Sequence, residues 1–116
     1  MAISNTQITQ ANSNTVIYTS SVGTGNVGNA ITTMIFCNTT VFDASQPTTG
    51  QALVTVYAVP NNKSASNETM IINKLPIPAG ETVSFDQEKM VLESGDKIVV
   101  TSTAATISVT ISTLAV

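Results

Sequence analysis

The sequence predicts an all-β domain built as a single antiparallel β-sandwich. Apolar side chains recur at every second position in segments rich in Val, Ile and Thr, and helical periodicity is nearly absent. Gly, Pro and Asn interrupt these segments at short intervals, as turns do. Seven to eight short strands arranged in this way are typical of immunoglobulin-like or jelly-roll-like sandwiches.

The last segment, residues 106–113, gives the clearest strand. Ile107, Val109 and Ile111 share one face, which we expect to be buried, while Ser and Thr side chains alternate with them on the other face. Residues 97–103 show the same alternation. Because only a short Ala-Ala link separates the two segments, we expect them to form a hairpin.

Two internal segments, residues 30–38 and 51–59, are apolar on both faces, which is typical of central strands covered on two sides. In the first segment we assign the face that carries Ile31 and Ile35 to the core. In the second we assign the face that carries Leu53.

Weaker alternation predicts strands at residues 15–19, 69–72 and 81–85. The apolar run at residues 90–92 fits either a further strand or a single helical turn. We expect the core to contain the following residues of these segments: Ile31, Ile35, Leu53, Val83, Phe85, Leu92, Ile98, Val100, Ile107, Val109 and Ile111.

The first 14 residues are polar and carry no clear strand pattern. We therefore interpret residues 1–14 as a flexible arm, or as one that becomes ordered on a neighbouring molecule. The sandwich domain then covers residues 15–116, with no internal repeat and no second domain.

The composition excludes several functions. The chain has 116 residues, no His, no Trp and a net charge of −3, and all four of its basic residues are Lys. Without His, a Ser-His-Asp triad and any His-bearing zinc site are excluded. Without Arg, an acidic chain has little with which to bind phosphates, so we expect no nucleic-acid partner.

Cysteine usage and targeting signals point to synthesis in the cytoplasm. Cys37 is the single cysteine, so no intrachain disulfide forms. The amino-terminal residues show neither the basic region nor the apolar run of a signal peptide. No apolar run approaches the ~20 residues that span a bilayer, so we expect no membrane partner.

No motif predicts catalysis. Gly23, Gly25 and Gly28 match the G-x-G-x-x-G pattern but lead into a predicted strand rather than a helix, so we interpret them as a flexible loop. Cys37 lacks a His to activate it and fits a small buried core residue. Lys63 and Ser64 show no geometry of a base and a nucleophile.

Acidic residues near the run at 90–92 are the only candidates for a metal site. They lack the dense spacing of a calcium-binding loop. We interpret Asp86 and Glu88, together with Lys89, as charges that keep an exposed strand edge soluble. We therefore expect a non-enzyme with no catalytic residue, no cofactor and no metal. The acidic residues are Asp86, Glu88, Glu93 and Asp96.

Residues 2–42 contain no charged side chain, and charged residues make up only 9% of the chain against about 25% in ordinary proteins. Interface cores are depleted in charge. This run therefore favours an assembly interface over a free, solvated surface.

Several segments resemble a group of small β-rich virion proteins of tailed phages, especially phages that infect cyanobacteria. The likeness is one of strands and turns and covers residues 17–116. The segments are 17–20 (IYTS), 33–38 (TMIFCN), 56–60 (VYAVP), 75–82 (LPIPAGET), 88–98 (EKMVLESGDKI) and 109–116 (VTISTLAV).

The resemblance implies a structural protein of the virion, with capsid decoration as the first interpretation. Its partners would be further copies of itself, as a trimer, and the major capsid protein or other virion proteins. A neck, tail or baseplate component is one alternative. A carbohydrate- or receptor-binding module of a fibre or adhesin is another, although the chain has only two Tyr and three Phe to stack on a sugar.

Overall fold

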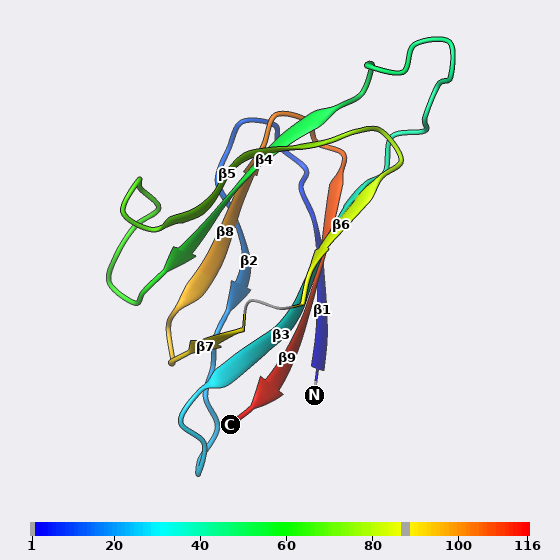
Figure 1. Cartoon of the computed structure of the whole chain (residues 1–116). Helices are drawn as coiled ribbons and strands as arrows, with labels where there is room; N and C mark the ends of the chain where they lie inside the picture. The colour runs from blue at the N-terminus through cyan, green and yellow to red at the C-terminus, as the bar shows by residue number, and fades with distance from the viewer. Residues whose placement is uncertain (1, 87–88) are drawn as a thin grey trace.

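The computed structural model describes residues 2–86 and 89–116, and within them the chain is all-β with no helix (Figure 1). Nine strands are present rather than the expected seven to eight. Eight of them overlap predicted segments, including residues 90–92, which form a strand, but the strand predicted at residues 69–72 continues to Ile77. The strands are β1 (Ala2–Gln7), β2 (Thr15–Thr19), β3 (Asn29–Asn38), β4 (Ala52–Val59), β5 (Met70–Ile77), β6 (Thr82–Phe85), β7 (Met90–Leu92), β8 (Lys97–Ser102) and β9 (Ile107–Ala115).

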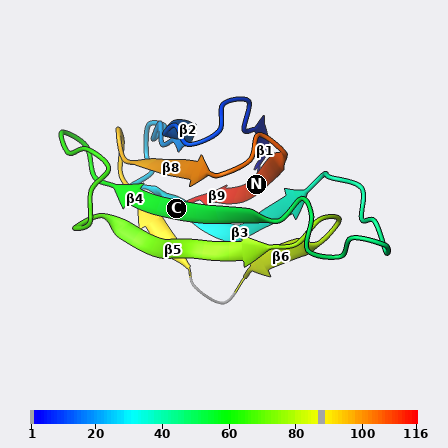
Figure 2. The ribbon, with the colours of Figure 1, turned by 90° about the horizontal axis from the view of Figure 1, so that it is seen from above.

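The strands form two packed sheets. Sheet A has the order β1-β9-β3-β6, with β7 also paired to β3, and sheet B has the order β2-β8-β4-β5. Every pairing is antiparallel and the pairings are nested: β1 with β9, β2 with β8, β3 with β6 and β7, and β4 with β5. This wrapping is that of a jelly roll rather than of an immunoglobulin-like sandwich, and Figure 2 shows the sandwich from above.

The core between the sheets contains most of the residues predicted for it. Seven of the eleven are buried, and Val83 and Phe85 are partly buried and pack against the same cluster. Phe36 is fully buried and meets Phe85 edge to face, with 6.0 Å between the ring centroids. The seven buried residues are Ile31, Leu92, Ile98, Val100, Ile107, Val109 and Ile111.

The predicted inward face of β3 is wrong beyond Ile31, because the strand contains a β-bulge. The register to β9 shifts between Ile31 and Thr33, which inserts Thr32 as an extra residue. The hydroxyl of Thr32 donates a hydrogen bond to the Ser112 carbonyl at 3.1 Å. One extra residue reverses the alternation, so Ile35 lies on the outer face while Met34 and Phe36 enter the core.

Leu53 is also assigned to the wrong face. In β4 the side chains of Ala52, Val54 and Val56 belong to the buried core cluster, and Leu53 is only half-buried on the opposite side. The alternation correctly separates the two faces, but both are apolar. It therefore does not say which of them meets the other sheet.

The predicted hairpin of the last two strands does not form. β8 lies in sheet B and β9 in sheet A, so the link between them crosses from one sheet to the other. Ser102 holds this crossing: its hydroxyl donates to the Ala104 carbonyl at 2.8 Å and accepts the Ala104 amide at 3.2 Å. The Thr103 amide donates back to the Leu53 carbonyl in sheet B.

The expectation of a flexible or partner-ordered arm at residues 1–14 is wrong for residues 2–8, which belong to the sandwich. β1 pairs with β9 of the same chain from Ala2 to Gln7, and the Ile8 amide extends the ladder by donating to the Ile107 carbonyl at 2.9 Å. The Ile8 side chain is fully buried in the core. The segment looks polar because Ser and Thr fill the inward positions of this edge strand before Ile8.

Candidate interaction surfaces

The structure separates the residues considered for chemistry. Among the described residues, no group of three or more acidic, Cys or His side chains is arranged to hold a metal ion. Asp96 instead joins two loops, since its carboxylate accepts the amides of Asn61 at 2.8 Å and Glu93 at 2.9 Å. Glu88 lies outside the described residues.

Lys89 lies at the edge of β3, between β6 and β7. Its ammonium group donates to the Thr32 carbonyl at 3.1 Å and to the Asp86 carbonyl. Thr32 lies between the residues of β3 that pair with β7 and those that pair with β6, so Lys89 places a charge on a part of the strand edge that neither strand covers.

The glycine-rich segment is a loop, as predicted, and leads into β3. Gly25 has a φ of +86°, and the Asn26 amide donates to the Gly23 carbonyl to close a turn. Gly28 lies against β7, where a Cβ atom would come within 2.6 Å of the Val91 side chain. The third glycine is therefore needed for close packing on β7.

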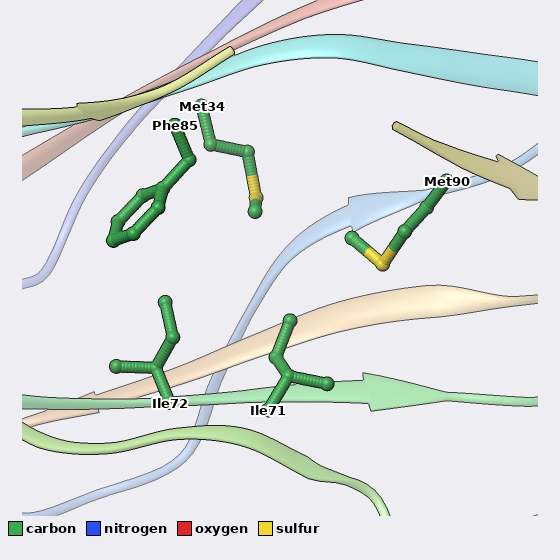
Figure 3. Close-up of a pocket in the computed structure, with 5 residues that line it drawn as sticks. All are labelled: Met34, Ile71, Ile72, Phe85 and Met90. Carbon is green, nitrogen blue, oxygen red and sulfur yellow. The ribbon is translucent and has the colours of Figure 1, made fainter. Parts of the chain in front are cut away.

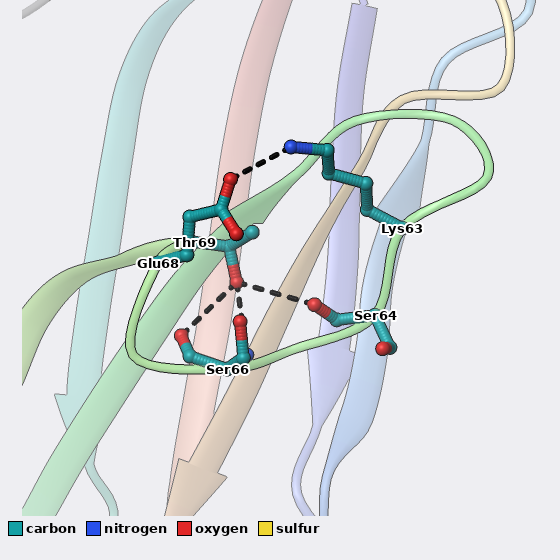
Figure 4. A network of polar contacts seen from close by, with 5 residues as sticks. All are labelled: Lys63, Ser64, Ser66, Glu68 and Thr69. Carbon is teal, nitrogen blue, oxygen red and sulfur yellow. Dashed lines mark hydrogen bonds and ion pairs between the residues drawn. The ribbon is translucent and has the colours of Figure 1, made fainter.

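Lys63 and Ser64 belong to the β4–β5 loop and have structural contacts (Figure 4). The Lys63 ammonium pairs with the Glu68 carboxylate at 2.8 Å, and both side chains are exposed. This hydrogen bond and the Lys63 charge lower the pKa of Glu68. Thr69 accepts the Ser66 amide at 3.0 Å and lies 3.5 Å from the Ser64 carbonyl. An exposed ion pair such as Lys63–Glu68 adds little stability, so its role is to shape the β4–β5 loop.

The strands of sheet A contribute no charged side chain to its outer face. None of the five strands of this sheet contains Asp, Glu, Lys or Arg, whereas sheet B has Lys74 and Lys97. In β9 the buried residues alternate with Ser108, Thr110 and Ser112, which therefore point outward. Their Cα partners on the adjacent strands share that face.

We call this surface the neutral face. It consists mainly of short polar side chains and also carries three apolar ones, the half-buried Ile35 and Cys37 and the 71% exposed Ile3. The expectation that Cys37 is a buried core residue is wrong, because its side chain lies half-buried on this face. Thr110 lies near its middle and donates to the Asn5 side chain at 2.8 Å. The face comprises Ile3, Asn5 and Gln7 of β1, Ser108, Thr110 and Ser112 of β9, Thr33, Ile35 and Cys37 of β3, and Thr82 and Ser84 of β6.

A second surface is the loop between β3 and β4, residues 39–51, which projects from the end of the sandwich (Figures 1 and 2). Val41 is 87% exposed and Phe42 is 52% exposed, although both are large and apolar. Asp43 follows them, and its carboxylate accepts the Ser45 amide at 2.9 Å and the Ser45 hydroxyl at 2.7 Å. These hydrogen bonds lower the pKa of Asp43, so the loop tip keeps its negative charge.

Asn38 anchors the base of this loop. It is fully buried, and its amide group donates to the carbonyls of Gly50 at 2.8 Å and Ile77 at 2.9 Å. Its side-chain oxygen accepts the Thr40 amide at 3.1 Å and the Thr106 hydroxyl at 3.0 Å. One side chain thus ties both ends of the loop to β5 and to the β8–β9 crossing.

We expect Asn38→Ala to destabilise the protein by about 2–3 kcal/mol, because it leaves buried carbonyls without donors. Urea denaturation followed by circular dichroism measures this change. Asn73→Ala, at an exposed position of β5, is the matched control and should have little effect. An Asn38→Ala variant as stable as the parent would show that water or backbone replaces these bonds.

A third feature is an apolar pocket of about 400 Å³ that opens between the sheets (Figure 3). It exists for two reasons. The edge of β3 is covered by two separate strands, β6 and β7, and the opposite strand β5 has an irregular register to β4 near Ile71. The lining residues are Met34, Ile71, Ile72, Phe85 and Met90.

Sequence reasoning did not identify the exposed apolar residues of the β3–β4 loop, Asn38 or the pocket. The signal for the exposed apolar residues of this loop was present, since Val41 and Phe42 form an isolated apolar pair between Thr40 and Asp43 in a polar segment. The pocket depends on which strands face each other across the sandwich. The role of Asn38 depends on which backbone groups lie within hydrogen-bond distance of its side chain. Neither can be read from one strand alone.

No known protein family matches this chain, and no curated protein is significantly similar to it. Within the described residues, no helix is long and apolar enough to cross a membrane.

Proposed function

We propose that this chain is a structural protein of a tailed-phage virion. In this proposal it decorates the capsid and stabilises the shell through protein–protein contacts with the major capsid protein. The observation that carries the proposal is the neutral face, a sheet surface made from five strands without one charged residue. Domains that stay free in solution usually carry charged residues on such surfaces, whereas the cores of protein interfaces are depleted in charged residues.

The chemistry of the neutral face suits docking without a large desolvation cost. Hydroxyl and amide groups transfer from water far more easily than charges do, and they find hydrogen-bond partners on another protein. The face also includes the free edge of β1, which a neighbouring chain could cover.

Two further observations are consistent with this proposal. Jelly-roll sandwiches occur among viral capsid domains, although a fold by itself does not decide function. The resemblance to phage virion proteins covers residues 17–116, which is the sandwich without β1 and the first residues of β2. It also leaves a neck, tail or baseplate location as the alternative within the virion.

A carbohydrate-binding role receives less support. Jelly rolls include lectins, but sugar sites need polar groups beside an aromatic ring. The five residues that line the pocket include one aromatic ring, Phe85, and no polar side chain.

The neutral face can be tested with a matched pair of substitutions. Thr110→Lys places a charge at the middle of this face, and Thr101→Lys places one on the outer face of sheet B. Both threonines donate to an asparagine side chain, Asn5 and Asn14 respectively. We expect Thr110→Lys to weaken co-sedimentation with emptied capsids of the encoding virus by about tenfold or more, and Thr101→Lys to leave it unchanged.

Circular dichroism checks that both variants remain folded. If Thr110→Lys binds capsids as the parent does, the neutral face is not the docking surface. If the parent chain ignores capsids and binds a tail protein or a host glycan instead, the alternative functions replace the decoration role.

A further inference from the structure

We propose that two copies of this chain pair through the free edge of β1, antiparallel and with Asn5 on the two-fold axis between them. This inference goes beyond the proposed function, because it concerns a contact between copies and needs no capsid. It rests on the backbone groups that β1 leaves unpaired, and on features that block the other sheet edges and are missing from β1.

The unpaired backbone groups of β1 belong to Ile3, Asn5 and Gln7. The Ile8 amide donates to the Ile107 carbonyl at 2.9 Å, and the bonds of an antiparallel ladder recur at every second residue. The even-numbered residues of β1 therefore direct their amides and carbonyls to β9, and the odd-numbered ones direct theirs to the free edge. Since β1 is the last strand of sheet A, no other strand of the described chain pairs with these groups.

The other edges of the two sheets carry features that hinder pairing with a further strand. β5 contains Lys74 and Pro76 and has register shifts to β4, and the ladder of β2 shifts between Val16 and Tyr18. β6 and β7 are only four and three residues long, and Lys89 lies between them. Charges, Pro, bulges and short strands are the usual means by which proteins block a sheet edge.

β1 has none of these features. It is six residues long, pairs with β9 without a register shift and contains no charged residue and no Pro. Ile3, Asn5 and Gln7 are all exposed, as residues of an uncovered edge are. An edge that stays open while the others are blocked indicates a strand that pairs in the assembled protein.

A second copy fits this edge because the edge is complementary to itself. When two β1 strands run antiparallel with Asn5 opposite Asn5, Ile3 of each copy lies opposite Gln7 of the other. Each unpaired amide then meets an unpaired carbonyl, whereas any other register leaves one of the three residues unpaired within β1. Because the edge is uncharged, two copies of this acidic chain place no like charges opposite each other.

The pairing is also compatible with the neutral face. The Thr110 hydroxyl donates to the Asn5 side-chain oxygen at 2.8 Å, which leaves the Asn5 amide group as a donor. At the two-fold axis this group lies opposite the Asn5 side chain of the other copy, whose oxygen can accept a second hydrogen bond. An axis perpendicular to the sheet keeps both neutral faces on the same side, so pairing joins them into one larger uncharged surface.

Pairing through β1 closes at two copies. The same edge is used on both chains, so the contact is isologous, and β1 has no second free edge with which to recruit a third chain. The expected product is a dimer with one continuous sheet, in place of the trimer that the resemblance implies.

Amide hydrogen exchange of the parent chain tests the pairing without any substitution. As the concentration rises from the monomer range into the dimer range, defined by sedimentation velocity, exchange at Ile3, Asn5 and Gln7 should slow by at least about tenfold. The amides of Ser4 and Thr6 bond to β9 and should be protected at both concentrations. A chain that stays monomeric at every concentration would overturn the proposal, as would edge amides that exchange equally fast in the dimer.

Asn5→Lys tests the position of the axis, because it places two ammonium groups opposite each other. Its matched control is Ser84→Lys, which adds the same charge to an exposed position of the neutral face on β6. We expect Asn5→Lys to raise the dissociation constant of the dimer by at least about tenfold and Ser84→Lys to leave it unchanged. Circular dichroism checks that both variants are folded. If the folded Asn5→Lys chain dimerises as tightly as the control, the contact does not lie at β1.

Cysteine cross-linking reports the register directly. In a Cys37→Ala background, the Ile3→Cys and Gln7→Cys chains are prepared separately and treated with a short thiol cross-linker. Neither chain alone should form cross-linked dimers, whereas their mixture should, because residue 3 lies opposite residue 7 of the other copy. Cross-linking of either chain alone, or none in the mixture, would contradict the assigned register.

None of these experiments contains a capsid, so their outcome is independent of the decoration role. A final exchange measurement, with emptied capsids of the encoding virus added to the monomer, separates the two possible partners of the edge. If the β1 amides become protected only in the presence of capsids, the edge pairs with a strand of the capsid and the proposed dimer is wrong.

Discussion

Val109→Asp is expected to destabilise the protein by about 3–5 kcal/mol, because it buries a carboxylate without a partner. Val109 is 1% exposed, and its partners in the sheet are Phe36 of β3 and Thr6 of β1. Domains of this size have a total stability of about 5–15 kcal/mol. The variant should therefore melt at a much lower temperature or fail to fold at 25 °C, as thermal denaturation monitored by circular dichroism would show.

The control is Ser108→Asp, one residue earlier in the same strand. Its side chain lies on the neutral face, where water reaches the new charge, so stability should change by about 0.5 kcal/mol at most. If Val109→Asp melts like Ser108→Asp, the inward face of β9 is assigned incorrectly.

The pH dependence of Val109→Asp gives an independent check. Burial raises the pKa of the introduced carboxyl group in the folded state above its unfolded value. The folded state then binds more protons than the unfolded state between these two pKa values, so stability falls as pH rises through that window. Lowering the pH should restore part of the stability relative to the parent chain.

The strands themselves could be predicted from the sequence because each is a local pattern. Alternation within β9 places Ile107, Val109 and Ile111 in the core without any knowledge of neighbouring strands, and the structure confirms all three. Turn residues between the segments gave most boundaries to within a residue or two. Both signals come from residues close together in the chain.

The errors concern relations between segments. Thr32 is as suitable for a regular strand as for a bulge, yet the bulge decides that Phe36 rather than Ile35 enters the core. Ala104 and Ala105 make a link of hairpin length, but the chain uses it to cross between the sheets. In each case the deciding contact, such as the Ser112 carbonyl for Thr32, lies far away in the sequence.

The sequence likewise predicts one of the candidate surfaces and not the other. The absence of charge over residues 2–42 was visible in the sequence, and the structure extends it to a whole sheet through β6, β7 and β9. The pocket was not visible, because Phe85 and Ile72 come from strands of different sheets. The composition of a segment can indicate an interface, but the pairing of the strands is needed to say which residues share a surface.

Deleting residues 2–8 is expected to cost about 2–5 kcal/mol, since it removes the strand beside β9 and the buried side chain of Ile8. It also removes the hydrogen bond from the Thr6 hydroxyl to the Ile17 carbonyl, 3.3 Å long, which joins the two sheets. This outcome differs from that of a flexible arm, whose deletion would leave the isolated sandwich equally stable.

Two isoleucines in this segment distinguish the possibilities without deleting anything. Ile8 is fully buried and Ile3 is 71% exposed, so Ile8→Ala should cost about 2–5 kcal/mol and Ile3→Ala about 0.5 kcal/mol or less. Urea denaturation of the purified chain measures both values. An arm that orders only on a neighbour predicts that neither substitution matters in the isolated protein. Equal stability of the two variants would therefore return residues 2–8 to the arm and remove the free edge of β1 from the neutral face.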